Sequence, residues 1–222
     1  MFYRLLKFVL GAIVRGLYRP RVEGLENVPA KGPVILAANH LAVIDSFVIP
    51  LVMPRRVTFL AKAEYFTERG LKGRIKRWWF TTIGAVPVER GNGRAARDSL
   101  DTALELLREG CAFGIHPEGT RSRDGHLHRG HVGVARLALS SGAPVVPVGL
   151  IGTDELQPVG KKLPRIRPVT IRFGKPLDFS RYDGLGSNLP MLRSITDQVM
   201  YAILELSDQE YVDSYAKRPE AA

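Results

Sequence analysis

Cysteine and long apolar runs are both scarce in this sequence of 222 residues. Its single cysteine, Cys111, excludes an intramolecular disulfide and fits a reduced, cytoplasmic setting. Only seven uncharged residues separate Lys7 from Arg15, whereas roughly 20 apolar residues are needed to cross a bilayer. Arg15, Arg19 and Arg21 then occupy the region where a signal peptide would have its small-residue cleavage site. We therefore expect neither a transmembrane helix nor a cleaved signal peptide in this segment.

Acidic residues are outnumbered by basic ones. The chain has 32 Lys and Arg against 22 Asp and Glu, which gives a formal net charge of +10 and a pI of about 10.0. This balance predicts an anionic partner, which could be nucleic acid, anionic lipid headgroups or a phosphorylated substrate. No nucleic-acid-binding module is recognisable, and most basic residues are scattered along the chain. We therefore expect a lipid or phosphate partner and no nucleic acid.

Residues 1–22 have the pattern of an amphipathic helix that lies on a membrane surface. One face of the helical wheel carries Leu5, Leu6, Val9, Leu10, Ala12, Ile13 and Leu17, and the other carries Arg4, Lys7, Gly11, Arg15 and Tyr18. A helix packed on the protein core would show a similar apolar stripe, but the basic residues of the other face favour lipid headgroups. We expect membrane lipids as partners and a peripheral or monotopic protein on the cytoplasmic face of the cell membrane.

From residue 33 onward, short apolar runs alternate with helical patterns, which is typical of an α/β fold with a largely parallel, mixed sheet flanked by helices. The pattern predicts strands at Pro33 to Ala38, Val57 to Ala61, Ala85 to Val88, Cys111 to Ile115, Val145 to Leu150 and Pro168 to Phe173. It predicts helices at Ile44 to Val52, Leu71 to Thr82, Arg94 to Glu109, His131 to Ser141 and Leu189 to Leu206. We expect one folded domain over residues 23–208 and a polar, disordered tail over residues 209–222.

His40 follows the first predicted strand, and Asp45 lies in the opening turn of the next predicted helix. On one continuous helix the two side chains would point about 140° apart, so His40 must lie on a loop for the carboxylate to reach its ring. A carboxylate bonded to one imidazole nitrogen leaves the other nitrogen able to take a proton from a hydroxyl. The pair therefore predicts a general base. Because such a spacing also arises by chance, the prediction needs support from other residues.

Two further polar clusters follow predicted strands, and each contains an arginine. One runs from Gly84 to Arg90, and the other runs from His116 to Ser122 and includes Arg121. Open α/β sheets bind their ligands beyond the carboxyl ends of the strands. A planar guanidinium suits a phosphate, so Arg90 and Arg121 together could hold a phosphomonoester close to His40. Each arginine could instead make only a surface ion pair.

These clusters together resemble the glycerolipid acyltransferase family typified by lysophosphatidate acyltransferase. Four ordered blocks carry the resemblance, namely Asn39 through Asp45, Gly84 through Arg90, Phe113 through Ser122 and Val145 through Gly149. The resemblance implies that His40 is the catalytic base and Asp45 its orienting partner. It further implies direct attack of an acceptor hydroxyl on an acyl thioester, without a metal, a cofactor or a covalent acyl-enzyme. The absence of a Gly-x-Ser-x-Gly motif agrees with direct attack.

The resemblance also implies a substrate-binding site in the second and third blocks. Arg90 and Arg121 would bind the phosphate of the acceptor, and Glu118 would position its glycerol part. Gly119 and Thr120, which lie between Glu118 and Arg121, would belong to the same site. The expected acceptor is lysophosphatidate and the expected product phosphatidate, made for phospholipid biosynthesis with acyl-CoA or acyl carrier protein as donor. Glycerol-3-phosphate, another lysophospholipid or a glycolipid are alternative acceptors, and a non-catalytic basic membrane- or nucleic-acid-binding protein is the rival from another class.

Three features outside these blocks need an interpretation. His116 stands where the family usually has an aromatic or aliphatic residue, and we expect it to pack and form hydrogen bonds rather than to act as a second catalytic histidine. His126, His128 and His131 lack a cysteine companion, so we expect a solvated loop and no metal site. Residues 72–80 combine basic and aromatic side chains, which fits either a membrane interface or tryptophans packed in the core.

Overall fold

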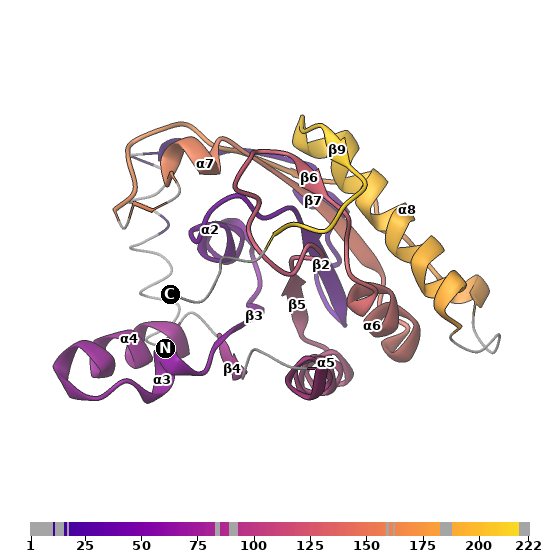
Figure 1. Cartoon of the computed structure of the whole chain (residues 1–222), viewed down its shortest axis with the longest axis horizontal. Helices are drawn as coiled ribbons and strands as arrows, with labels where there is room; N and C mark the ends of the chain where they lie inside the picture. Colours follow the sequence, from indigo (N-terminus) through magenta and orange to yellow (C-terminus); the bar gives the residue numbers. More distant parts are fainter. Residues whose placement is uncertain are drawn as a thin grey trace.

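A computed structural model of the chain describes residues 11, 16, 18–82, 85–88, 93–158, 160–161, 163–182 and 188–217. A seven-stranded sheet runs through its centre in the order β1-β8-β7-β2-β5-β3-β4, with helices on both faces (Figure 1). Neighbouring strands are parallel except for β7 and β8, which are antiparallel. The predicted α/β fold with a largely parallel, mixed sheet is therefore confirmed.

All six predicted strands are present, and their ends differ from the prediction by two residues at most. The sheet consists of β1 (Arg21–Glu23), β2 (Val34–Ala38), β3 (Val57–Lys62), β4 (Val86–Val88), β5 (Ala112–Ile115), β7 (Val145–Ile151) and β8 (Thr170–Phe173). The edge strand β1 was not predicted. It pairs with β8 through three residues, which is too short a run to show the alternation of apolar and polar residues by which a strand is recognised.

The five predicted helices are also present, again with ends that differ by two residues at most. They are α2 (Asp45–Val52), α4 (Gly70–Thr82), α5 (Gly93–Arg108), α6 (Gly133–Ser141) and α8 (Leu189–Ser207). Gly110 follows α5 with a φ of 80°, a backbone conformation that favours glycine at the C-terminal end of a helix. The short elements α3 (Glu64–Thr67), α7 (Thr153–Leu156), η1 (Leu25–Asn27) and η2 (Ser180–Tyr182) were not predicted, because one turn of helix carries too few residues for a periodic pattern.

The central strand β2 sends alternate side chains into two separate cores. Ile35 and Ala37 lie in the core formed with α5, α6 and α8, whereas Leu36 lies in the core formed with α2. All five residues of β2 are buried, which explains why the strand contains only apolar side chains. The first polar residues after β2 therefore lie at the carboxyl end of this central strand.

The prediction of a disordered tail over residues 209–222 is wrong for residues 209–217. Within that stretch β9 (Tyr211–Val212) forms a parallel pair with β6 (Leu127–His128), and the ring of Tyr215 stacks on His131. A two-residue strand is held by backbone hydrogen bonds and therefore leaves no apolar stripe in the sequence. Residues 218–222 lie outside the described residues.

The predicted N-terminal helix lies almost wholly outside the described residues, so the amphipathic, membrane-associating segment stays a prediction. Its expected end at residue 22 falls inside β1, which places the beginning of the folded domain no later than Arg21. Among the helices that the structure describes, none combines the length and the apolar character needed to span a membrane.

Candidate active site

The polar residues of two predicted blocks meet where the central strands end. β2 and β5 are parallel neighbours, with Ala37 paired to Ile115. His40 therefore comes close to the segment that begins at His116. The backbone amide of Ser122 donates a hydrogen bond of 2.7 Å to the carbonyl of His40, which joins the two loops directly.

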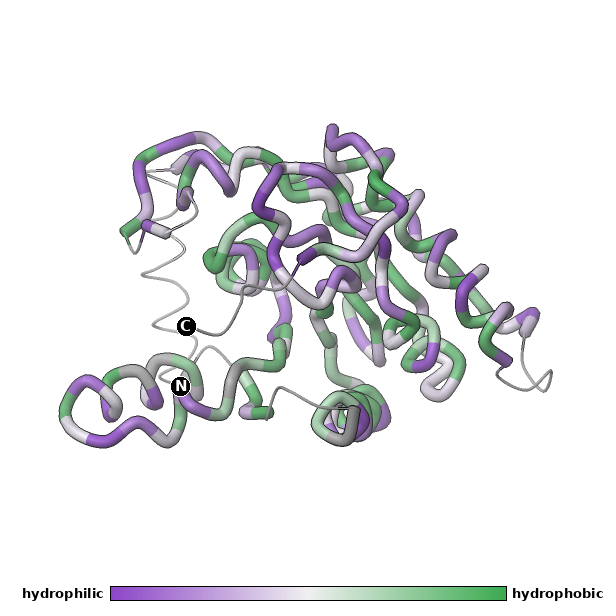
Figure 2. The backbone as a smooth tube through the Cα atoms, in the orientation of Figure 1, coloured by the Kyte–Doolittle hydropathy of each residue, from purple (hydrophilic) through white to green (hydrophobic). Residues whose placement is uncertain are grey.

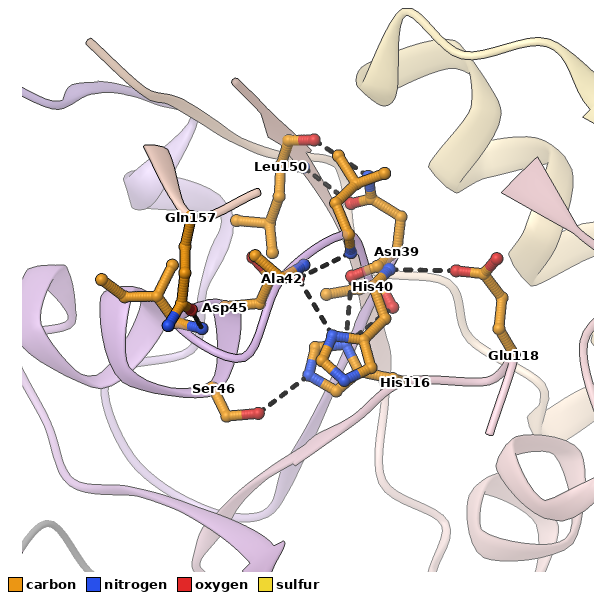
Figure 3. A network of polar contacts seen from close by, with 12 residues as sticks. Asn39, His40, Ala42, Asp45, Ser46, His116, Glu118, Leu150 and Gln157 are labelled. Carbon is orange, nitrogen blue, oxygen red and sulfur yellow. Dashed lines mark hydrogen bonds and ion pairs between the residues drawn. The ribbon is translucent and has the colours of Figure 1, made fainter. Parts of the chain in front are cut away.

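His40 and Asp45 form the predicted pair. Nδ1 of His40 lies 2.9 Å from Oδ2 of Asp45, the first residue of α2 (Figure 3). The same oxygen accepts hydrogen bonds from the backbone amides of Leu41 and Ala42, at 2.7 and 2.8 Å. His40 thus stands on a loop and the carboxylate reaches back to its ring, as the five-residue spacing requires.

The environment of Asp45 keeps its carboxyl group ionised. Burial by itself would raise the pKa of Asp45, but the hydrogen bond with His40, the positive charge that His40 and His116 can carry and the amide of Ala42 together hold this pKa below its ordinary value. An ionised Asp45 fixes the proton of His40 on Nδ1. Nε2 of His40 then carries the lone pair, which is the state a general base needs.

His116 stacks on the ring of His40. The ring centroids are 3.9 Å apart with 9° between the planes, and Phe59 lies on His116 with its centroid at 5.5 Å. Nδ1 of His116 donates toward the carbonyls of Ala38 and Asn39, at 3.2 and 3.0 Å, and Nε2 accepts from the hydroxyl of Ser46 at 3.1 Å. The expected packing and hydrogen-bonding contacts of His116 are therefore present (Figure 3).

His116 is neutral in this environment. Burial, followed by the nearby positive charge of His40, lowers its pKa from 6.5 to about 3. The stacked partner of His40 is therefore an uncharged ring, which would not repel a protonated His40.

Glu118 links the His40 loop to the C-terminal part of the domain. Its Oε2 accepts from the backbone amide of His40 at 2.9 Å, and its Oε1 accepts from the amide of His128 at 3.0 Å. Burial raises the pKa of Glu118 to about 7, although the two amide bonds act in the opposite direction. Each oxygen already accepts a backbone hydrogen bond and the residue is buried, so the contact between Glu118 and the glycerol part of an acceptor stays a prediction.

Asn39, the neighbour of His40, makes contacts that the sequence did not reveal. Its buried side chain donates to the carbonyl of Leu150 at 2.9 Å and accepts from the amide of the same residue at 2.8 Å. It also donates to Oε1 of Gln209 at 2.7 Å, while Nε2 of Gln209 donates to the carbonyl of Gly125 at 2.6 Å. The residue before His40 is therefore clamped between β7 and the C-terminal segment.

The remaining predicted substrate-binding residues lie beyond β5 or outside the described residues. Gly119 adopts a φ of 70° and its amide donates to the carbonyl of His116 at 3.0 Å, so a glycine suits this turn. Thr120 and Arg121 follow in the loop and are half-buried, and Arg121 directly precedes the Ser122 that bonds to His40. Arg90 lies outside the described residues, two positions after the end of β4.

The three other histidines have separate environments. Nε2 of His128 lies 3.0 Å from Oδ1 of Asp124, and this buried histidine contradicts the expectation of a wholly solvated loop. His131 stacks on Tyr215 with the ring centroids 4.6 Å apart. In the part of the chain that the structure describes, no three His, Cys, Asp or Glu side chains form a group suited to a metal ion.

Comparison with known proteins identifies close resemblances. Residues 19–151 match the family described as Acyltransferase. A chloroplastic 1-acyl-sn-glycerol-3-phosphate acyltransferase of Arabidopsis thaliana is 32% identical over 170 residues, which are 76% of this chain and 46% of that protein. A 1-acyl-sn-glycerol-3-phosphate acyltransferase of Bacillus subtilis is 30% identical over 191 residues, which are 85% of this chain and 88% of that protein. The chain thus spans less than half the length of the plant relative and most of the bacterial one.

A solved structure has the same fold. The crystal structure of the 1-acyl-sn-glycerophosphate (LPA) acyltransferase PlsC from Thermotoga maritima superposes with a TM-score of 0.64 and 25% sequence identity. The match covers 90% of this chain and 81% of the other. The arrangement of sheet and helices described above is therefore shared along nearly the whole chain.

Proposed function

Because this chain belongs to the acyltransferase family, we propose that it transfers a fatty acyl group to the hydroxyl of lysophosphatidate and so makes phosphatidate. The observation that carries the proposal is the pair formed by His40 and the buried Asp45. The similarity to 1-acyl-sn-glycerol-3-phosphate acyltransferases supports lysophosphatidate as the acceptor. We further propose that the donor is an acyl thioester of coenzyme A or of acyl carrier protein.

His40 acts as the general base in this proposal. Its Nε2 takes the proton of the acceptor hydroxyl while the hydroxyl oxygen attacks the carbonyl carbon of the thioester. The resulting tetrahedral oxyanion collapses, the carbon–sulfur bond breaks, and the imidazolium returns the proton to the departing thiolate. Asp45 holds the ring and stabilises the imidazolium between the two proton transfers. No covalent acyl-enzyme is formed.

Arg121 and Arg90 bind the phosphate of the acceptor in this proposal. The direct bond between Ser122 and the carbonyl of His40 supports a position for Arg121 close to the base. A guanidinium offers two parallel N–H donors to a phosphate, so it fixes both the charge and the orientation of the acceptor. Gly119 and Thr120 complete the loop on which Arg121 stands, and the buried Glu118 supports that loop and His40 together.

We propose that the protein works at the cytoplasmic face of the membrane as a peripheral or monotopic enzyme, because both the acceptor and the product are lipids. The basic composition and the amphipathic pattern of residues 1–22 support this location. It also places the enzyme where acyl-CoA or acyl carrier protein is available.

A panel of acceptors tests the proposed function most broadly. Purified full-length protein is incubated with labelled acyl-CoA, or acyl carrier protein carrying the same chain, and with lysophosphatidate, glycerol-3-phosphate, a neutral lysophospholipid and a glycolipid. We expect phosphatidate as the main product. Product from glycerol-3-phosphate alone would move the assignment to that acceptor, and the absence of product from every acceptor would leave the basic binding protein as the better hypothesis.

A further inference from the structure

One face of helix α4 packs on other described parts of the chain. Phe80 lies on this inner face. The centroid of its ring is 4.7 Å from that of Tyr65 and 5.8 Å from those of Phe66 and Phe47. Gly73 is buried on the same side, and a Cβ atom there would meet the backbone of Glu68. These contacts fix which face of α4 is turned toward the domain.

The opposite face of α4 exposes a stripe of large apolar side chains. Leu71, Ile75 and Trp78 are 72%, 57% and 48% exposed, and their spacing places them within about one third of the helix circumference. A helix packed on a core normally turns such a stripe inward. Here the apolar stripe faces solvent although the helix already has a packed inner face.

Basic residues lie on both sides of this apolar stripe, and the helix contains no acidic residue. Lys72, Arg74 and Arg77 are exposed, and the sequence of α4 contains no Asp or Glu. The combination of an apolar stripe, a tryptophan and a basic border matches the anionic, interfacial region of a bilayer in both charge and polarity.

A second exposed segment has the same composition. The connection after α7 exposes Leu163 and Ile166, at 81% and 67%, alternating with the exposed Arg165 and Arg167. In Figure 1 both α4 and this connection extend to the left side of the molecule, whereas α8 lies on the right. Figure 2 shows apolar and polar positions alternating along both segments.

We infer that the outer face of α4, formed by Leu71, Ile75 and Trp78 with the exposed basic residues Lys72, Arg74 and Arg77 along its sides, is a docking surface for an anionic lipid bilayer. The apolar side chains enter the region between headgroups and acyl chains, and the basic side chains bind the headgroup phosphates. The connection that carries Leu163 and Ile166 forms a second contact with the same bilayer. This surface deepens the membrane part of the proposed function, because it binds lipid whichever acceptor the active site uses.

Vesicle binding by matched double variants tests the docking surface. The full-length protein, Leu71→Ser/Ile75→Ser and Leu189→Ser/Tyr201→Ser are sedimented with vesicles of phosphatidylcholine mixed with phosphatidylglycerol. The control pair removes two similarly exposed apolar side chains from α8. We expect binding on the order of tenfold weaker for the α4 variant and unchanged binding for the control. Circular dichroism checks that both variants are folded.

A charge variant separates the two components of binding. Lys72→Gln/Arg74→Gln/Arg77→Gln is expected to weaken binding to the phosphatidylglycerol-containing vesicles on the order of tenfold and to leave binding to pure phosphatidylcholine nearly unchanged. Its binding should also become less sensitive to salt. Unchanged binding of both α4 variants, or an equal loss in the α8 control, would overturn the docking surface. The docking surface would also be overturned if the α4 variant lost self-association while its vesicle binding stayed unchanged.

A second assay distinguishes a failure of the docking surface from a failure of the proposed function. It measures acyl transfer by each variant to a short-chain, soluble lysophosphatidate. We expect all the variants to retain that activity, because the outer face of α4 contains no catalytic residue. Absence of acyl transfer in the unmodified protein, together with vesicle binding that follows the α4 face, would refute the proposed reaction and leave the docking surface standing.

Discussion

The imidazole rings of His40 and His116 lie face to face, with their centroids 3.9 Å apart and only 9° between their planes. One ring has a carboxylate on Nδ1, and burial lowers the pKa of the other ring to about 3. Two adjacent histidines could suggest two interchangeable bases. Under the proposed function, their different hydrogen bonds suit His40 to accept a proton and His116 to hold the ring of His40 in place.

Replacement of His116 distinguishes a positioning role from a catalytic one. His116→Phe keeps a flat ring against His40 but loses the bonds to Ser46 and to the carbonyls of Ala38 and Asn39. We expect kcat to fall by no more than about tenfold and stability to fall by about 1 kcal/mol. His116→Ala, which removes the stack, should lower kcat further. A loss in His116→Phe as large as that in His40→Ala would contradict the positioning role.

The buried carboxyl group of Glu118 should make the stability of the protein depend on pH. Burial raises the pKa of Glu118 to about 7 in the folded chain, above its ordinary value of 4.5. Its contribution to stability is therefore fully present below about pH 4.5 and is lost as the pH rises through about 7. Urea unfolding of the native protein and of Glu118→Gln measures the free energy of unfolding of each across this pH range. As the pH rises, we expect the native protein to lose free energy of unfolding relative to Glu118→Gln. A difference that is independent of pH would contradict the raised pKa.

The contact between Asn39 and Gln209 predicts that the C-terminal segment supports catalysis from a distance. Gln209→Ala removes the bonds to Asn39 and to the carbonyl of Gly125. We expect kcat to fall about tenfold with little change in KM, since the His40 loop loses a support but the binding residues remain. Glu210→Ala is the matched control, because its side chain is exposed and its backbone carbonyl still bonds to Leu127. Equal kinetics for the two variants would remove Gln209 from the positioning residues.

Arg121 should determine affinity for the phosphate rather than the rate of chemistry. For Arg121→Gln we expect KM for lysophosphatidate to rise on the order of tenfold or more, because a charge-assisted contact with the phosphate is lost. Arg123→Gln removes an exposed arginine two residues away and serves as control. Acceptor titrations at saturating acyl-CoA measure both. An unchanged KM for Arg121→Gln would show that another group holds the phosphate.

The sequence predicted the parts of the site that depend on local spacing. His40 and Asp45 are five residues apart, so the loop and the opening turn of α2 suffice to bring them together. The central strands were predictable because burial on both faces demands continuous apolar runs, which β2 shows in full. The clusters that follow β2 and β5 meet because these strands are parallel neighbours.

Contacts between distant segments could not be predicted in the same way. The carboxylate of Glu118 reaches the amide of His40, 78 positions away, and nothing in the local pattern selects that amide. The amide of Asn39 meets Gln209 across 170 positions, and the two-residue strand β9 that follows Gln209 has no periodicity to reveal it. The predicted disorder of the tail was wrong for this reason: its order comes from partners elsewhere in the fold.

The turnover of His40→Ala is the most direct test of the central claim that His40 is the general base of an acyltransferase. Initial rates of acyl transfer to lysophosphatidate are compared for the native protein, His40→Ala and the control His126→Ala, and vesicle binding is measured on the same samples. We predict that His40→Ala loses turnover on the order of a hundredfold or more, with vesicle binding and the control unchanged. Turnover of His40→Ala equal to that of the native protein would contradict the account.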